Sequence, residues 1–380
     1  MRFAVFHALV ALWVLWRFWI PLPISRRAKA AGFLATLAAA AFPAATALFC
    51  GGLISPELPA WVLVVGNGCD FALVMLGALT LAREAVIFFS VLAGRKGERL
   101  HAFVQKDRRV ALGMAAAAAG LSAFGIHEGI RVPDVRRMDL PVRNLPEGLE
   151  GLTVVQLSDL HASALLTEPH MAALVERVNS LNPDLIVLTG DIVDGTVSAR
   201  EKDVQPLAGL RAPLGVFACE GNHEHYIDYE GWLARYRELG IRVLRNEWVG
   251  LERNGARLTL GAVTDPWARR FGRELPDPVK AFSGSPADAP RILLSHQPKH
   301  ARRFDDAVRF DAQLSGHTHG GQIVGMDRGV AVLNGTFLRG WYALRRARLY
   351  VHSGSGLWNG FPVRLGIPSE IALFTLRRAS

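Results

Sequence analysis

Long apolar stretches fill the first third of the chain, and short apolar runs separated by polar turns fill the rest. A run of about 20 apolar residues predicts a helix that crosses a membrane, because a rise of 1.5 Å per residue then covers a hydrocarbon core of about 30 Å. We therefore expect an all-helical transmembrane region of about four helices within residues 1–130. The four apolar stretches cover residues 3–22, 31–54, 61–82 and 110–130.

The third stretch has an ambiguous end. Arg83 and Glu84 interrupt it, and residues 85–94 are apolar again. A separate span would need more residues than this short run supplies. We interpret the stretch as one spanning helix that continues into a cytoplasmic extension, and a second short span is the less favoured alternative.

The pattern changes after a predicted linker at residues 131–149. Short apolar runs then precede polar segments, and residues 168–180 have apolar positions at helical spacing. A strand, a helix and a strand in this order predict a βαβ unit, and hence an α/β fold, for a domain over residues 150–380. The predicted strands cover residues 152–157, 185–188, 216–219, 291–294 and 312–314.

Charge divides the chain at the same place. Before residue 131 there are 12 Lys and Arg against 6 Asp and Glu, and from residue 131 onward there are 31 against 28. This contrast is typical of a membrane segment joined to a soluble domain. The formal net charge of +9 does not indicate nucleic-acid binding, because the second part has no basic stripe laced with aromatic residues. The three cysteines form no Cys-x-x-Cys pair, so no cysteine-based metal site is predicted.

The basic residues also predict the orientation in the membrane. Residues 23–30 and 95–109 carry nine of the first part's twelve basic residues, whereas residues 55–60 carry only Glu57. Since positive loops stay on the cytoplasmic side, the following domain is expected on the outer side, with the lipid bilayer as a partner. Arg108-Arg109 is either part of this basic flank or, because it resembles one, a twin-arginine export signal, and either would send the domain outward.

Two ionisable residues lie within or near the predicted spans. Arg17 can extend from a helix end to the membrane surface. Asp70 is either a packing or pairing residue or a functional group of the membrane region. The sequence leaves these alternatives open.

Polar clusters follow the predicted strands, at the carboxyl ends where α/β sheets gather their ligands. Each cluster alone is a weak signal, because a lone buried histidine is more often a satisfied core residue than a ligand. Together they supply the histidine, aspartate and asparagine side chains that suit a borderline divalent metal. We expect an extended backbone at Asp159 and His161 to place both side chains on one face. The clusters are Ser158-Asp159-Leu160-His161, Thr189-Gly190-Asp191, Gly221-Asn222-His223-Glu224, Leu294-Ser295-His296 and Ser315-Gly316-His317-Thr318-His319-Gly320-Gly321-Gln322.

The order Asp-x-His, Gly-Asp, Gly-Asn-His-Glu, His and Gly-His-x-His resembles the calcineurin-like metallophosphoesterases over residues 150–376. The Gly-His-Thr-His-Gly-Gly-Gln form, and the tail from Gly356 to Glu370, resemble the bacterial membrane-associated branch of that family. The resemblance implies a four-layer α/β/β/α sandwich, with two sheets packed face to face. It also makes the expected membrane a bacterial inner membrane, so the outer side that the basic loops predict for the domain is its periplasmic or extracellular side.

The resemblance further implies a centre of two divalent metal ions, whether Mn, Zn or Fe. Glu224 occupies a position where the family accepts either carboxylate, and it would orient a neighbour or be a solvated side chain. The implied metal ligands are Asp159, His161 and His319 for the first ion, Asn222, His296 and His317 for the second, and Asp191 as the bridge, with His223 as a catalytic neighbour that binds neither ion.

Such a site implies hydrolysis of a phosphoester. Two metals about 3.5–4 Å apart can share a hydroxide that attacks phosphorus, and a histidine can protonate the leaving oxygen. We expect a membrane-anchored phosphodiesterase whose substrate is lipid-linked or part of the cell envelope. One alternative is an enzyme similar to the UDP-2,3-diacylglucosamine pyrophosphatases of lipid A synthesis, which would need a cytoplasmic site. An alternative of another class is a membrane receptor or scaffold whose domain only binds a ligand.

Overall fold

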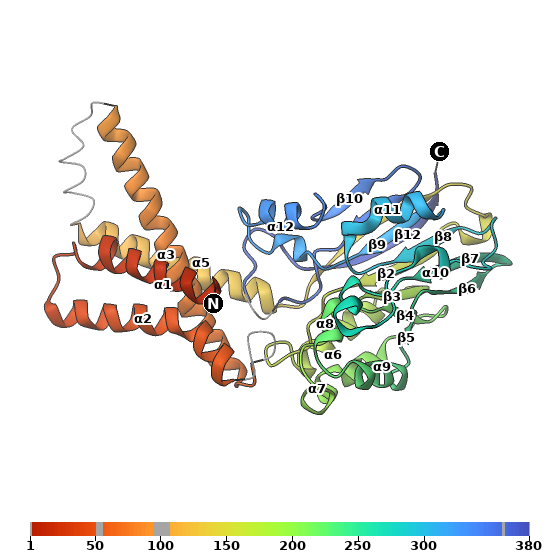
Figure 1. Cartoon of the computed structure of the whole chain (residues 1–380), viewed down its shortest axis with the longest axis horizontal. Coiled ribbons are helices and arrows are strands. Elements are labelled where there is room, and N and C mark those ends of the chain that lie inside the picture. Colours follow the sequence, from red (N-terminus) through yellow and green to blue (C-terminus); the bar gives the residue numbers. More distant parts are fainter. Residues whose placement is uncertain (1, 51–55, 94–106, 359–361, 380) are drawn as a thin grey trace. The chain divides into compact units, whose positions relative to one another are not determined.

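The computed structural model describes residues 2–50, 56–93, 107–358 and 362–379 (Figure 1). The chain separates into two compact units, one of residues 1–127 with 360–363 and one of residues 128–359 with 364–380. Of the basic cytoplasmic loop predicted at residues 95–109, residues 95–106 lie outside the described part of the chain.

The first unit consists of apolar helices, as predicted. Among the described residues, α2, α3 and α5 are long and apolar enough to cross a membrane, and a shorter apolar helix covers Ala4–Trp19. The interpretation of the third stretch as a single helix is confirmed, because α3 continues without a break past Arg83 and Glu84. The helices are α1 (Arg2–Val14), which continues as a π-helical turn (Leu15–Trp19), α2 (Arg26–Phe49), α3 (Ala60–Leu92) and α5 (Arg108–Ile130).

Polar side chains pair between the helices of this unit. The Nε2 of His7 on α1 lies 3.2 Å from the Oδ2 of Asp70 on α3, and both side chains are buried. Arg17 forms an ion pair with Glu84 of α3. In a membrane, an apolar side chain gains little by contacting another helix instead of a lipid tail. Polar contacts such as these therefore favour association between helices. The geometry therefore favours the pairing role for Asp70.

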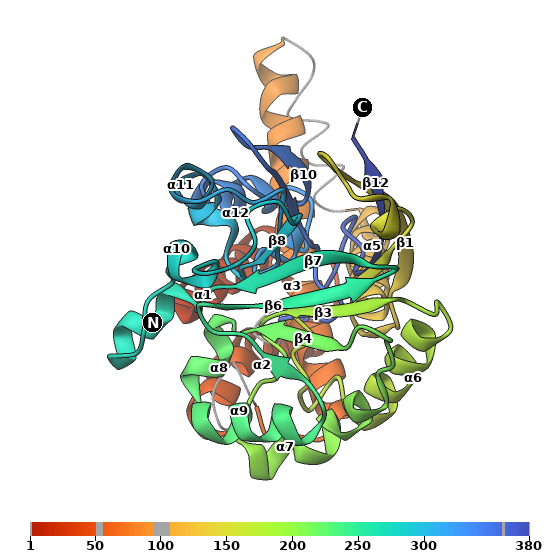
Figure 2. The ribbon, with the colours of Figure 1, turned by 90° about the vertical axis from the view of Figure 1, so that its right-hand side faces the viewer.

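The second unit contains two six-stranded sheets. Figures 1 and 2 show how these sheets lie within the unit. The first has the order β1-β12-β2-β3-β4-β5, and the second has the order β10-β11-β9-β8-β7-β6. The strands of the first sheet are β1 (Asp134–Val142), β2 (Thr153–Leu157), β3 (Leu185–Thr189), β4 (Val216–Cys219), β5 (Arg242–Val243) and β12 (Glu370–Arg378). Those of the second are β6 (Glu247–Arg253), β7 (Ala256–Ala262), β8 (Arg291–Leu294), β9 (Ala312–Ser315), β10 (Gly340–Ala343) and β11 (Arg348–Val351).

Helices cover the outer face of each sheet, which completes four layers. In both views α6, α7 and α9 lie against the first sheet, and α10 and α11 lie on the side of the second. The helices of this unit are α6 (Glu168–Asn179), α7 (Val197–Val204), α8 (Asn222–Tyr226), α9 (Tyr229–Glu238), α10 (Pro278–Ala281), α11 (Ala301–Ala307) and α12 (Asp327–Leu333). Short 3₁₀ turns cover Glu147–Leu149, Gln205–Gly209, Pro266–Phe271, Pro298–His300 and His319–Gly321.

Successive side chains along a central strand point to opposite faces of its sheet and pack in different cores. Val154 faces the other sheet and packs in one core with Leu260 and Leu314, whereas Val155 packs in a second core with Leu174 of α6. Both faces of the central strands are thus buried, which is why they appear in the sequence as continuous apolar runs. The predicted α/β/β/α sandwich is confirmed.

The stretch from residue 131 to 149, expected as a linker, contains a strand of the first sheet. β1 pairs in parallel with β12 from Asp134 to Val142. Most of its side chains are exposed or half-buried and several are charged, as befits the edge of a sheet. An edge strand of this kind lacks the apolar run by which β2, β3, β4, β8 and β9 were predicted.

Candidate metal centre

Five turns bring the predicted site residues to one edge of the two sheets. β2, β3 and β4 run parallel in the first sheet, and β7, β8 and β9 run parallel in the second. Their carboxyl ends therefore lie side by side, and the polar residue clusters follow directly. The residues concerned are Asp159 and His161 after β2, Asp191 after β3, Asn222 and His223 after β4, His296 after β8, and His317 and His319 after β9.

Left-handed backbone conformations turn these side chains inward. The φ angles are +53° at Asp159, +44° at His161, +51° at Asp191, +72° at His317 and +49° at His319. The extended backbone expected at Asp159 and His161 is therefore wrong, since two left-handed residues bring their side chains together instead. Each such residue costs about 1–3 kcal/mol and persists only where its surroundings hold it, so the concentration here indicates a functional site.

Asp159, His161 and His319 form the first group of donor atoms, with one donor of each within 4.8 Å of the others. The Nε2 atoms of His161 and His319 are 3.0 Å apart, and the Nε2 of His319 lies 3.4 Å from the Oδ1 of Asp159. Two nitrogen ligands about 2.1 Å from a cation, at roughly a right angle, are about 3.0 Å apart. The spacing of this group fits a bound metal ion.

Asp191, His296 and His317 form a second group within the same limit. The Nε2 of His296 lies 3.0 Å from the Oδ2 of Asp191 and 3.2 Å from the Nδ1 of His317. The Oδ1 of Asn222 lies 3.1 Å from the same Nε2 atom, which adds a neutral oxygen donor. This mixture of imidazole, carboxylate and amide donors suits a borderline divalent metal.

The carboxylate of Asp191 connects the two groups. Its Oδ2 is 3.0 Å from the Nε2 of His296 in the second group and 3.9 Å from the Nε2 of His161 in the first. Its Oδ1 accepts a hydrogen bond of 2.8 Å from the backbone N–H of His223. The Asp191 carboxylate thus lies near imidazole nitrogens of both groups.

Several donors are oriented through their other polar atoms. The Nδ1 of His296 is 2.7 Å from the backbone carbonyl of Thr189, so an Nδ1–H donated to that oxygen leaves the Nε2 lone pair toward the site. The carboxylate of Asp159 accepts hydrogen bonds from the hydroxyl of Ser158 and from the backbone N–H of His317. Such contacts to the backbone hold donor atoms in place before a metal binds.

Asp194 is a site residue that the sequence reasoning missed. It is fully buried, and its Oδ1 lies 3.1 Å from the Nδ1 of His161 and 2.5 Å from the Nδ1 of His223. Burial lowers the pKa of His223, but Asp191 and Asp194 raise it to about 9. One carboxylate thus sets the tautomers of two histidines, one in the first donor group and one beside both. In the sequence, the feature that could have identified Asp194 is its position three residues after Asp191.

Glu224 is buried and not a solvated side chain. Its carboxylate accepts hydrogen bonds from the backbone N–H groups of Asp191, Ile192 and Gly221, at 3.0, 2.7 and 2.7 Å. One charged group therefore joins the turn after β3 to the turn after β4. Of the two alternatives from the sequence, the structure shows the orienting role.

Burial and neighbouring charges shift the pKa values of the donor groups, and not all of them in the direction that favours metal binding. Burial raises the pKa of Asp191, but the histidines around it hold that pKa well below its usual range. Burial together with His296 lowers the pKa of His317 to about 3, and burial with neighbouring cations lowers that of His319. Burial lowers the pKa of His296, yet contact with Asp191 raises it well above normal, so a proton is favoured where a cation would bind. Metal ligands are ionised carboxylates and neutral imidazoles, so Asp191, His317 and His319 are in the form that binds a divalent ion, whereas His296 would release its proton to the solvent on binding one.

Arg364 is a second residue without a predicted role. Its side chain is fully buried, and it donates to the backbone carbonyls of Ser353 and Gly356 at 2.8 and 2.7 Å and of His319 at 3.3 Å. These contacts join the loop that carries His319 to the loop after β11. Both loops are thereby fixed behind the first donor group.

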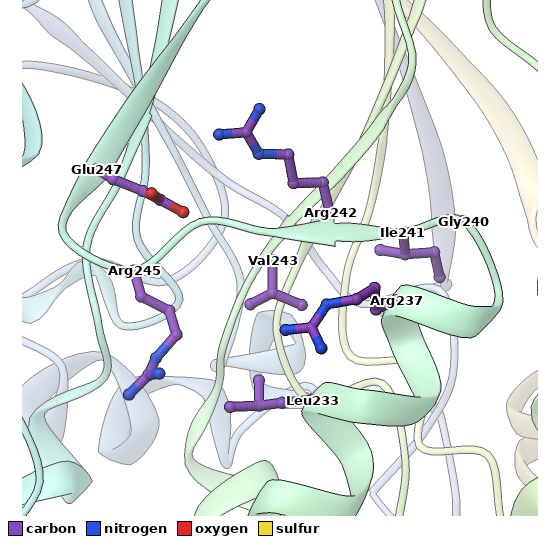
Figure 3. Close-up of a pocket in the computed structure, with 8 residues that line it drawn as sticks. All are labelled: Leu233, Arg237, Gly240, Ile241, Arg242, Val243, Arg245 and Glu247. Carbon is purple, nitrogen blue, oxygen red and sulfur yellow. The ribbon is translucent and has the colours of Figure 1, made fainter.

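A surface pocket elsewhere on the domain is separate from this cluster. Figure 3 shows this pocket, about 480 Å³ in volume, between the end of α9 and β5. Arg237, Arg242 and Arg245 line it, and none of the predicted ligands does. The chemistry is therefore assigned to the strand ends and not to this pocket.

Comparison with known proteins agrees with this geometry. The family model of the calcineurin-like phosphoesterases matches residues 152–321. A transmembrane protein with metallophosphoesterase domain from Bos taurus is 33% identical over 340 residues, which cover 86% of this chain and 76% of that protein. An uncharacterized metallophosphoesterase from Helicobacter pylori is 31% identical over 321 residues, which cover 84% and 83%. A relative from Danio rerio, with the same description as the bovine protein, is 34% identical, but the match spans only 61% of its length and 69% of this chain.

The chain belongs to the calcineurin-like metallophosphoesterase family, whose members use a divalent metal centre. It is accordingly a hydrolase that acts on phosphoester bonds. Its long apolar helices and its transmembrane relatives indicate that it associates with a membrane.

Glu224→Gln tests whether this carboxylate positions the metal site. An amide nitrogen would replace one acceptor oxygen and face a backbone N–H, so we expect metal binding to weaken by roughly 10–100-fold, as for other groups that orient ligands. Equilibrium dialysis of the full-length protein against Mn²⁺ measures this, with the exposed Glu238→Gln as the matched control. Unchanged affinity in Glu224→Gln would contradict the positioning role.

Proposed function

We propose that the protein is a membrane-anchored phosphodiesterase with a centre of two divalent metal ions. The observation that supports this most directly is the position of Asp191, whose carboxylate lies between two groups of donor atoms. A single ion would leave one of these groups of buried polar side chains without a charge to bind. Two ions that share a bridging carboxylate use both groups.

The ligand assignment follows the two groups. Asp159, His161 and His319, whose donors already approach one another, would hold the first ion. His296 and His317 with the amide oxygen of Asn222 would hold the second, and Asp191 would contribute to both. Two divalent ions in this arrangement supply a hydroxide near neutral pH and neutralise the charge of the phosphoryl oxygens.

His223 acts on the leaving group. Its Nδ1 contacts Asp194, which stabilises the protonated imidazole, and its Nε2 is directed toward the site, 3.9 Å from the Oδ2 of Asp191. A histidine oriented by a carboxylate can transfer a proton to the departing oxygen, which a diester with an alkoxide leaving group needs. A domain that only binds a ligand would normally have lost some of these donors, and all the predicted donors are present.

The substrate and the location are inferred from the membrane region. We propose that the domain lies on the periplasmic or extracellular side of a bacterial inner membrane, because the basic loops belong inside. An enzyme held at a bilayer encounters lipid-linked and envelope phosphoesters at high local concentration. A phosphoester of this class is therefore the proposed substrate, and the metals are Mn, Zn or Fe.

Hydrolysis of bis(p-nitrophenyl) phosphate by the full-length protein in detergent tests the proposed activity. The whole chain is used because β1 begins within four residues of α5 and belongs to the sheet. After metal removal with a chelator, we expect no turnover, and added Mn²⁺, Zn²⁺ or Fe²⁺ should restore it. Asp191→Asn should abolish turnover with every metal, because it weakens both ion sites at once. A folded protein that binds two ions per chain and shows no turnover would favour the receptor alternative.

His223→Ala separates catalysis from metal binding. We expect the variant to keep two ions per chain and to lose turnover by roughly 10²–10⁴-fold, because only proton transfer is removed. Metal content by inductively coupled plasma spectrometry and the rate constant are measured on the same sample. Loss of metal in this variant would show that His223 is a ligand.

Labelling of introduced cysteines tests the proposed orientation. Glu201 is exposed on α7, so Glu201→Cys should react with a membrane-impermeant maleimide in intact spheroplasts. Arg27→Cys, at the start of α2 and in a predicted inner loop, should react only after lysis. The reverse pattern would place the active site in the cytoplasm and favour the pyrophosphatase alternative.

A further inference from the structure

The segment that follows His319 exposes an unusual set of apolar side chains. Val324 is 62% exposed, Met326 53%, Val332 76% and Leu333 73%. None of the residues of α12 is buried. A helix of a folded domain normally buries one apolar face. Single exposed apolar residues are common on protein surfaces, but several exposed apolar residues in one short segment require an explanation. We call residues 324–333 the apolar segment.

The apolar segment is held firmly beside the metal centre. The backbone N–H of Val324 donates to the carbonyl of Leu365 at 3.1 Å, and a Cβ at Gly321 would meet the α-carbon of Asp327 at 2.6 Å. The side chain of Gln322 accepts a hydrogen bond from the N–H of Trp358, a half-exposed aromatic residue. The segment therefore begins five residues after a proposed metal ligand and is anchored to that ligand's turn.

The charge around the apolar segment is strongly basic. From residue 318 to 346 there are four arginines and a single acidic residue, Asp327. The carboxylate of Asp327 accepts hydrogen bonds from the backbone N–H groups of Gly325 and Arg328, so it closes a local turn. The side chains of Arg328 and Arg339 are exposed. Apolar side chains with arginines beside them match the surface of a bilayer that contains anionic lipids.

The chain keeps the domain close to such a surface. α5 ends at Ile130 and β1 begins at Asp134, so three residues connect the last long apolar helix to the first strand. Three residues extend at most about 10 Å. A bilayer crossed by α5 is consequently within reach of the domain at all times, unlike a separate protein partner.

We propose that the apolar segment, with Arg328 and Arg339, docks the catalytic domain on the surface of an anionic lipid bilayer. Docking buries the exposed valine, methionine and leucine side chains among lipid headgroups and acyl chains, and the arginines contact the phosphates. Because the segment is anchored to the turn of His319, docking brings the metal centre close to headgroup phosphoesters. The inference deepens the proposed function by specifying a substrate presented at the membrane surface.

A fluorescent probe on the apolar segment tests the docking. The full-length protein, with Cys50 and Cys69 replaced by serine and the buried Cys219 kept, carries Val332→Cys labelled with a polarity-sensitive dye in vesicles. We expect a blue-shifted emission and quenching by nitroxide-labelled lipid, both stronger when phosphatidylglycerol is added to phosphatidylcholine. The matched control is Val279→Cys on α10, another valine that is more than half exposed. Figure 1 shows α10 apart from α12 on the same domain.

The arginine contribution is measured separately. Arg328→Gln and Arg339→Gln should each lower the docked population roughly fivefold in anionic vesicles and leave it unchanged in phosphatidylcholine alone, since each basic residue gains energy only near anionic lipid. Quenching at position 332 no stronger than at position 279 would overturn the proposal. Shielding of position 332 from aqueous iodide without quenching by lipid would also overturn it, because a protein surface and not lipid would then cover the segment.

The same samples distinguish failure of the docking from failure of the proposed function. Turnover of bis(p-nitrophenyl) phosphate needs no contact with a bilayer, so normal turnover without lipid quenching refutes only the docking. Lipid quenching without turnover refutes only the proposed catalytic activity. Asp191→Asn should dock like the unsubstituted protein.

Discussion

The carboxylate of Asp191 is surrounded by imidazoles that come from three separate turns, and much of the domain keeps it there. Glu224 binds the backbone on either side of this carboxylate, and the left-handed backbone of Asp191 itself turns the side chain inward. Gly221 is required because a Cβ at this position would overlap the Asp191 carboxylate. The buried charge is tolerated since the neighbouring histidines and backbone N–H groups replace the water it has lost. Packing of the two sheets against each other supplies the rigid frame for these contacts.

The strands predicted from the sequence are those whose apolar runs lead directly into the polar clusters. The helix expected at residues 168–180 is α6, Glu168–Asn179, and the five predicted strands correspond to β2, β3, β4, β8 and β9. β1 was missed because an exposed edge strand with charged residues has no apolar run. The left-handed turns were missed because Asp159 and His161 allow several backbone conformations, and the choice depends on contacts with residues far along the chain.

The candidate site shows the same limit. The donor residues are visible in the sequence because each stands in a short motif after a strand. Asp194 and Arg364 are visible only in three dimensions, since what identifies Asp194 is its pair of contacts to His161 and His223. Likewise the partner of Asp70 could not be read from its own helix, because His7 belongs to α1, more than sixty residues earlier. Long-range pairing of polar groups is the information that a local pattern lacks.

The position of β12 has a consequence for how the chain is made. This strand, close to the carboxyl terminus, lies between β1 and β2, which come at the start of the domain. While the ribosome is still translating, β1 and one edge of β2 have no partner strand, and unpaired strand edges favour association between chains. The domain therefore closes only after its last strand is released, while α5 has already emerged. Truncation of even the final ten residues would leave an open sheet and not a slightly shorter enzyme.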